Sequence, residues 1–276
     1  MKAMALDWLV KALIVYVFIL VVLYFYQRNM VYFPDVKRPN ATEWGIVDYS
    51  PVVQVQSSDG LNIEGWYFSS ENKEKPIIVM FHGNAGHIAH RLFKLPKLIE
   101  AGYSVLLAEY RGYGGNPGKP SEEGLYKDAR AYLDWLINEE GIQEEDIILH
   151  GESLGTGVAV QMATEYNVGG VVLESAYDSV VNVAKKTYFF VPVRLLMKDQ
   201  YSSVEKITGM EAPLLMVHGQ KDRIIPISFA KNLFDHALEP KKIVIIPEAG
   251  HNDLYKYDVS LHILKFLSNM TDVTKH

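Results

Sequence analysis

The stretch ILHGESLGTGVAV, residues 148–160, decides the predicted fold. A short apolar run leads to a serine among glycines, and helix-forming residues begin directly afterwards. The five residues from Gly151 to Gly155 fit G-x-S-x-G, a sharp turn between a strand and a helix that exposes the hydroxyl of Ser153. Glycines are expected on both sides because such a turn leaves no room for Cβ atoms. The pattern alone is also compatible with a purely structural strand-to-helix turn.

Six short apolar runs are distributed along the chain, separated by amphipathic segments such as residues 121–139. The runs are residues 76–82, 103–110, 146–151, 170–175, 213–219 and 242–248. Continuous rather than alternating apolar runs are typical of parallel strands covered by helices on both faces. Residues 52–57 and 61–68 alternate around Asp59-Gly60 and predict a β-hairpin. We therefore expect the α/β class, with a mostly parallel central sheet and helices on both faces.

Composition and charge limit the classes of function. Hydrophobic residues make up 49% and charged residues 22% of the 276 residues, which is globular composition with room for a membrane segment. The 27 basic and 33 acidic residues leave a net charge of −6 without a basic stripe, so no nucleic-acid partner is expected. The chain has no cysteine, which excludes disulfides, thiolate catalysis and cysteine zinc sites.

The N-terminal segment predicts a membrane anchor. Residues 8–26 are apolar apart from Lys11 and long enough to cross a bilayer as a helix, with aromatic residues near both ends. A cleaved signal peptide would need a small-x-small site, which the following QRNMVYFP lacks. A buried core helix is rarely so uniformly apolar. We expect a single-pass anchor within residues 1–28, on a side of the membrane that the sequence leaves undecided.

The rest of the chain divides into a connector and one domain. Residues 29–50 form a polar connector with prolines, and residues 51–270 form the predicted α/β domain. Residues 176–212 are the one long connection in it and contain the apolar series KKTYFFVPVRLLM. A connection of this length inside a compact domain favours a functional lid, and the alternative is an ordinary surface helix.

A serine hydroxyl needs a base, and the base needs a group that orients it. His251 follows the last apolar run and Asp222 follows the run before it, so Ser153, Asp222 and His251 stand in the chain order expected of this fold. Taken singly, His251 is also compatible with a core or capping histidine, and Asp222 with a solvated turn. Asp178 and Glu174 are the rival acids, and their positions suit this order less well.

The stretch FHGNAGH offers backbone donors for a developing oxyanion. Acyl transfer places negative charge on a carbonyl oxygen, and two N–H groups directed at it stabilise that charge. Asn84, after His82-Gly83, and Leu154, after the serine, are the expected donors, with Ala85 as the alternative to Asn84.

Two further groups of residues carry weaker signals. His82, His87 and His90 suggest metal binding, but the set has no clustered carboxylates and no H-E-x-x-H pattern. Neither a metal nor an organic cofactor is therefore expected. Glu109 and Arg111 belong to a turn-rich loop, in which a pair between them would shape the floor of the site or, as we favour, stabilise the loop.

Together the motifs FHGNAG, EYRGYGGNPG, GESLG, HGQKD and GHND resemble those of the α/β-hydrolase superfamily, over about residues 30–270. The chain is most similar to its membrane-anchored serine hydrolases, in which an N-terminal helix precedes a segment like VYFP. Members include esterases, thioesterases that remove fatty acyl groups from proteins, and proteins described as peptidases. The resemblance implies a serine hydrolase with Ser153, Asp222 and His251 as its triad. Glu109 departs from many relatives, which have aspartate there.

These expectations define a reaction and its rivals. Ser153 attacks an acyl carbonyl, His251 takes its proton, and Asp222 holds the imidazole. The expected substrates are carboxylic esters or thioesters of acyl type, among them lipids and lipidated proteins. The alternatives are a serine peptidase of the same fold and a catalytically silent, membrane-tethered scaffold. The sequence determines neither the acyl chain, the leaving group nor the oligomeric state.

Overall fold

The computed structural model describes residues 2–46 and 51–273, so Met1 of the predicted anchor and residues 47–50 of the predicted connector lie outside it. An eight-stranded sheet in the order β10-β9-β8-β7-β4-β6-β3-β2 forms the centre of the domain. Its strands are β2 (Val52–Gln56), β3 (Asn62–Phe68), β4 (Ile77–Phe81), β6 (Ser104–Ala108), β7 (Ile147–Glu152), β8 (Gly170–Glu174), β9 (Leu214–Gly219) and β10 (Lys241–Ile246). The pairs β2–β3 and β3–β6 are antiparallel, and all other neighbours are parallel.

The α/β prediction is confirmed in detail. Each of the six apolar runs contains a parallel strand, and the predicted hairpin is the antiparallel pair β2–β3, with Val55 opposite Ile63. Strands β4, β6, β8 and β9 are buried along their whole length, and β7 is buried up to its last residue, Glu152. Side chains on both faces of these strands are therefore removed from water, which explains why their sequences do not alternate.

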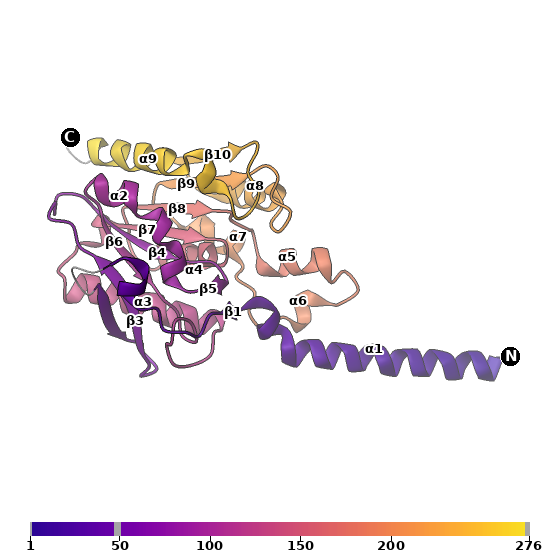
Figure 1. Ribbon diagram of the computed structural model, residues 1–276. Helices are drawn as coiled ribbons and strands as arrows, with labels where there is room; N and C mark the ends of the chain where they lie inside the picture. Colours follow the sequence, from indigo (N-terminus) through magenta and orange to yellow (C-terminus); the bar gives the residue numbers. More distant parts are fainter. Residues whose placement is uncertain (1, 47–50, 274–276) are drawn as a thin grey trace.

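Helices cover both faces of the sheet (Figure 1). One apolar core lies between the sheet and the helices α3 (Glu122–Asn138), α4 (Leu154–Ala163) and α8 (Ile227–His236). The second core lies under α2 (Pro96–Glu100) and α9 (Val259–Val273). Short 3-10 helices lie in the connections: η1 (Ala41–Trp44), η2 (Ile88–Lys94), η3 (Glu144–Asp146) and η5 (Leu254–Tyr257).

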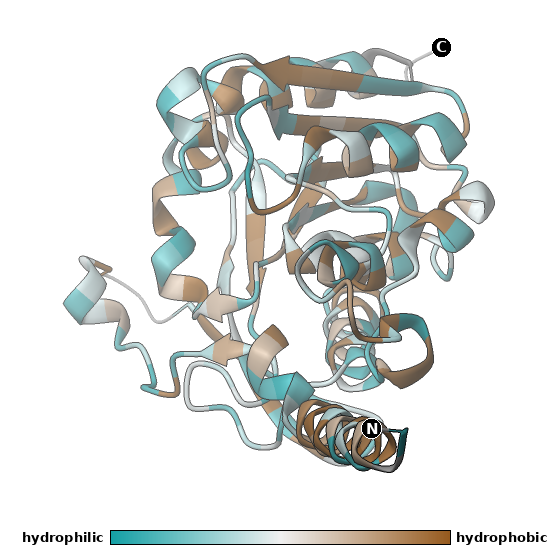
Figure 2. Cartoon of the chain, turned by 90° about the vertical axis from the view of Figure 1, so that its right-hand side faces the viewer, coloured by the Kyte–Doolittle hydropathy of each residue, from teal (hydrophilic) through white to brown (hydrophobic). Residues whose placement is uncertain are grey.

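Helix α1 (Lys2–Val31) projects away from the domain (Figure 1). Its segment Met4–Val31 is long and apolar enough to cross a membrane, and none of its most apolar window is buried. Figure 2 looks along this helix and shows hydrophobic residues around it. At about 1.5 Å per residue the 30-residue helix is roughly 45 Å long, which exceeds the ~30 Å hydrocarbon core of a bilayer. Part of α1 can therefore extend beyond a membrane and contact the domain.

The segment after β8 lies beside the domain end of α1 (Figure 1). Residues 176–212 hold the helices α5 (Val180–Thr187), α6 (Val193–Leu196), α7 (Ser203–Lys206) and η4 (Ile207–Gly209). After α1 the chain forms the short strand β1 (Phe33–Pro34), which pairs in parallel with β5 (Ala85–Gly86). The chain that leaves the helix is thus attached to the loop that follows β4.

Candidate active site

Ser153 occupies a tight turn between β7 and α4. Its backbone has φ 49° and ψ −113°, a conformation that side-chain-bearing residues rarely adopt. A Cβ atom on Gly155 would lie 2.0 Å from the carbonyl oxygen of Phe81, and one on Gly151 would lie 2.6 Å from the Gly155 carbonyl oxygen. The two glycines are therefore required by the close approach of β4, β7 and α4 around the serine, as the motif predicts.

The structure brings Ser153, His251 and Asp222 together. His251 Nε2 lies 3.0 Å from Ser153 Oγ, and His251 Nδ1 lies 2.7 Å from Asp222 Oδ2. The other carboxylate oxygen of Asp222 accepts hydrogen bonds from the amides of Ile224 and Ile225, at 2.9 and 2.8 Å. Asp222 is buried and held by its own turn, so its carboxylate is positioned before any substrate binds.

The two rival acids are engaged elsewhere. Asp178 accepts hydrogen bonds from the amide of Ser179 and from the side chains of Asn182 and Asn232. Glu174 accepts from the Tyr255 hydroxyl and forms ion pairs on the α2 side of the sheet. Within the described residues, Asp222 is the carboxylate in contact with His251 Nδ1.

Asn84 and Leu154, the two expected oxyanion donors, both line the cavity that contains Ser153. Leu154 is the first residue of α4, where backbone N–H groups have no acceptor inside the helix. Within the described residues, neither amide donates to another protein group. A Cβ atom on Gly83 would lie 3.5 Å from Ser153 Cβ, which shows how closely the loop before Asn84 approaches the serine.

Asn84 is held in place by the chain that leaves α1. Its carbonyl oxygen accepts from the Phe33 amide at 2.8 Å and from the Tyr113 hydroxyl at 2.8 Å. Its side-chain amide donates to the Val31 carbonyl oxygen at 2.7 Å. Sequence reasoning missed these contacts because residues 31 and 33 belong to the predicted connector. The VYFP segment was the only signal in the sequence that could have indicated them.

Behind the serine lies a buried ionic cluster. Glu152 contacts Arg91 at 3.0 Å and Lys94 at 2.7 Å, and Lys94 also contacts Glu174, which pairs with His150 at 2.9 Å. Burial alone would raise the pKa of Glu174, but the attraction of the Lys94 ammonium and of His150 outweighs it and holds this pKa at about 2. Both carboxylates are therefore ionised and paired near neutral pH.

In the loop after β6, Glu109 and Arg111 have different partners and do not pair with each other. Glu109 accepts from the amide of Ile88 at 2.9 Å and lies 2.7 Å from His82 Nε2. Arg111 instead binds Asp128 and Asp59, with contacts of 2.7 Å to each. The considered pair between Glu109 and Arg111 is thus replaced by two separate networks, although the two residues are only two positions apart.

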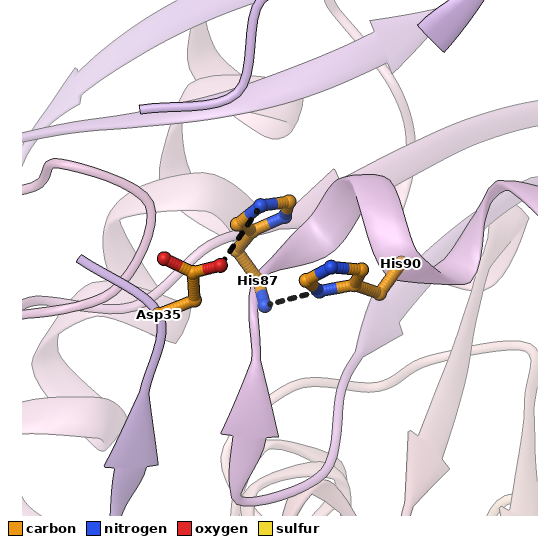
Figure 3. Close-up of side chains that lie close together, drawn as sticks. All are labelled: Asp35, His87 and His90. Atoms are coloured by element: carbon orange, nitrogen blue, oxygen red, sulfur yellow. Dashed lines mark hydrogen bonds and ion pairs between the residues drawn. The ribbon is translucent and has the colours of Figure 1, made fainter. Parts of the chain in front are cut away.

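The three histidines do not form a common site. His82 is hydrogen-bonded to the carboxylate of Glu109. Asp35, His87 and His90 lie together instead, and their side-chain oxygen and nitrogen atoms that could bind a metal are within 4.8 Å of one another (Figure 3). The rings of His87 and His90 are stacked, with centroids 4.0 Å apart and planes 12° apart. Lone pairs of imidazole nitrogens lie in the ring plane, and nearly parallel planes direct them side by side. This arrangement does not converge on one tetrahedral metal position.

A cavity of about 590 Å³ opens at the serine. Its walls come from α1, the loop after β4, α5 with the following turn, and the loops that carry Asp222 and His251. Most of the lining side chains are aliphatic or aromatic, with a few polar groups near Ser153, which is typical of sites for apolar ligands. The lining residues from α5 and its turn are Val180, Val183, Ala184, Thr187, Tyr188, Val191 and Val193.

Comparison with known proteins agrees with this architecture. The family described as "Serine aminopeptidase, S33" matches residues 72–187, which include Asn84 and Ser153. An uncharacterized protein of Mycobacterium tuberculosis is 39% identical over 228 residues, covering 82% of this chain and 81% of that protein. Human alpha/beta hydrolase domain-containing protein 17B is 31% identical over 217 residues, covering 76% of this chain and 72% of that protein.

A structural relative extends the comparison. The structure of an esterase of Pyrococcus furiosus superposes with a TM-score of 0.70 at 17% identity, covering 87% of this chain and 99% of that one. At this identity the likeness concerns the fold alone. Together with the sequence relatives, it confirms the resemblance that the five motifs indicated.

Proposed function

This chain belongs to the α/β-hydrolase family, and from that premise we propose that it is a membrane-anchored serine hydrolase of carboxylic esters or thioesters. The observation that carries the proposal is the hydrogen-bonded series from Ser153 Oγ through His251 to Asp222, with distances of 3.0 and 2.7 Å. A serine whose hydroxyl faces an imidazole oriented by a buried carboxylate is the arrangement that nucleophilic acyl transfer requires.

The reaction follows from these positions. Ser153 Oγ bonds to the acyl carbon while His251 Nε2 takes the hydroxyl proton, and Asp222 stabilises the imidazolium through Nδ1–H. The amides of Asn84 and Leu154 donate to the oxyanion of the tetrahedral intermediate. His251 then gives its proton to the leaving alcohol or thiol, which leaves an acyl-enzyme. Water, deprotonated by the same imidazole, releases the carboxylic acid and restores the serine.

The cavity favours an acyl substrate over a peptide. An aminopeptidase needs a free carboxylate to hold the α-amino group of its substrate. Glu152 borders the cavity, but Arg91 and Lys94 already neutralise it. The apolar walls suit a hydrocarbon chain, whose burial contributes about 0.8 kcal/mol per methylene. A serine peptidase is the second candidate, favoured by the description of the matching family.

Helix α1 supports the membrane-anchored part of the proposal. Its apolar side chains are exposed along the helix, which is unfavourable in water and favourable in lipid. Gln27 and Arg28, near its end, bond to the segment after α6. A signal peptide removed near this point would take those contacts away, so they favour a retained anchor.

Fluorophosphonate labelling of the full chain in detergent tests the assignment, followed by hydrolysis of p-nitrophenyl butyrate, an acyl thioester and an aminoacyl p-nitroanilide. We expect labelling at Ser153, ester and thioester hydrolysis, and the loss of both in Ser153→Ala. Ser175→Ala is the matched control, because Ser175 shares the positive φ of Ser153, at 51°, and is buried away from the cavity. Full turnover by Ser153→Ala, or cleavage of the anilide alone, would refute the proposal.

A further inference from the structure

We propose that the domain end of α1 is a wall of the acyl site, and that the acyl chain enters this site from the bilayer between α1 and residues 188–197. This inference rests on the proposed function and adds to it a route for the substrate and the residues that select it. The anchor is then part of the binding site as well as a tether.

One face of α1 borders the cavity. Leu23, Tyr24, Gln27, Met30 and Val31 line it together with Ser153. The five helix residues are spaced so that they fall on one face of a helix, and all but Tyr24 are partly buried. A cavity that reaches from the catalytic serine to the side of an apolar helix provides a continuous surface for a hydrocarbon chain.

Hydrogen bonds fix this face of α1 against the segment after α6. Gln27 donates to the Leu196 carbonyl oxygen at 3.1 Å and accepts from the Lys198 amide at 2.7 Å. Arg28 forms two bonds to the carboxylate of Asp199, at 2.8 and 3.1 Å, and this aspartate is buried. A simple tether does not need a fixed rotation and position of the helix against the domain, whereas a helix that forms a wall of a binding site does.

The turn after α5 is suited to the interior of a bilayer. Phe189 and Leu195 are each 85% exposed, although both are large and apolar. The carbonyl oxygen of Phe190, in the same turn, accepts a hydrogen bond at 2.7 Å from the hydroxyl of Tyr16, in the middle of α1. Irregular backbone is tolerated at membrane depth only where its polar groups have protein partners, and Tyr16 supplies one.

The position of Tyr16 along the helix places this turn. Tyr16 precedes Arg28 by 12 residues, which is about 18 Å along the helix at 1.5 Å per residue. With Arg28 at the membrane boundary, the turn beside Tyr16 lies inside the hydrocarbon region. The gap between α1 and this turn then opens to lipid, so an acyl chain reaches Ser153 without crossing water.

Substitution on two adjacent helix positions tests the wall. We compare the full chain in phosphatidylcholine vesicles as Leu23→Trp, which projects into the cavity, and Val22→Trp, on the exposed side. For Leu23→Trp we expect kcat/KM for p-nitrophenyl palmitate to fall about 10-fold or more relative to kcat/KM for the acetate. Val22→Trp should change neither. Equal loss on both esters, or no loss on either, would overturn the inference.

A measurement independent of catalysis tests the membrane location. The chain lacks cysteine, so Leu195→Cys and the control Glu140→Cys, an exposed position just beyond α3, each accept one fluorescent maleimide. We expect lipids with a nitroxide on the acyl chain to quench the dye at 195 and not at 140. Equal fluorescence at both positions would overturn bilayer access whatever the hydrolysis results. Absence of ester hydrolysis by the unaltered chain would instead refute the proposed function.

Discussion

Replacing Lys94 with methionine should reverse the pH dependence of stability. Lys94 is buried and lies between the carboxylate of Glu152, at 2.7 Å and partly exposed, and the buried carboxylate of Glu174. Methionine keeps much of the side-chain volume and removes the charge. Arg91 still faces Glu152, so the substitution acts most strongly on Glu174.

The magnitude follows from the pKa of Glu174. In the folded protein this pKa is lowered from 4.5 to about 2. One pKa unit corresponds to about 1.4 kcal/mol, so ionisation of Glu174 contributes roughly 3 kcal/mol to the free energy of unfolding at neutral pH. Because the folded pKa lies below the unfolded one, this contribution is present above pH ~4.5 and is lost as the pH falls towards 2. Removing one partner of a buried ion pair costs about 3–5 kcal/mol of stability, which is similar to this contribution of Glu174.

Without Lys94, burial dominates and the pKa of Glu174 should rise above its unfolded value. The folded variant then binds the proton of Glu174 more strongly than the unfolded variant does, so its free energy of unfolding falls as the pH rises from 4 to 7. Over the same range the free energy of unfolding of the wild type rises or stays constant. Thermal unfolding of the full chain in detergent, followed by tryptophan fluorescence at several pH values, measures both slopes.

A surface lysine provides the control for this experiment. Lys97→Met removes an exposed ion pair with Asp258 at 3.0 Å and should change stability by less than about 1 kcal/mol at any pH. A Lys94→Met curve that runs parallel to the wild type with a small offset would show that the cluster does not depend on this ammonium.

Three further predictions concern the turn, the acid and the anchor. Asp222→Asn should lower kcat for p-nitrophenyl butyrate on the order of 10⁴-fold. Asp178→Asn should retain activity and lower the unfolding temperature. A greater loss of kcat in Asp178→Asn than in Asp222→Asn would identify Asp178 as the acid of the triad. Gly155→Ala should prevent folding, because its Cβ would lie 2.0 Å from a backbone oxygen, while Gly209→Ala meets open space and should fold normally, as circular dichroism would show. A chain beginning at Asn29 keeps the contacts to the loop after β4, so it should hydrolyse short soluble esters and lose efficiency on long-chain esters in vesicles; equal loss on both would contradict this.

The sequence predicted the sheet and the convergence at its edge because both depend on local patterns. Apolar runs indicated buried strands, and the glycines around Ser153 indicated a turn without space for Cβ atoms. Asp222 and His251 were placed by chain order, since residues that follow parallel strands meet at one edge of the sheet. In the structure, the side chain of His251 lies within hydrogen-bonding distance of both Ser153 and Asp222.

Pairings between distant residues could not be predicted. Lys94 and Glu174 are 80 residues apart, and neither has a neighbour in the sequence that indicates the other. Glu109 and Arg111 are close in sequence, which suggested a pair, but the backbone of the loop directs them to different partners. Charge-pair choice depends on which side chains the tertiary fold buries together, and a single sequence does not contain that information.

Helix α1 shows why a hydropathy pattern can conceal a binding site. A helix that packs against a soluble domain has a polar face and an apolar face, and the contrast identifies the buried side. In the arrangement that we propose, one face meets lipid and the other an acyl cavity, so both are apolar and no contrast remains. The polar residues Gln27 and Arg28, which follow the predicted span, fix the helix against the end of α6 and the residues after it. If the proposed route is correct, the same apolarity that holds the protein in the bilayer selects its substrate. Changes to the inner face of α1 would then alter acyl specificity without altering anchoring.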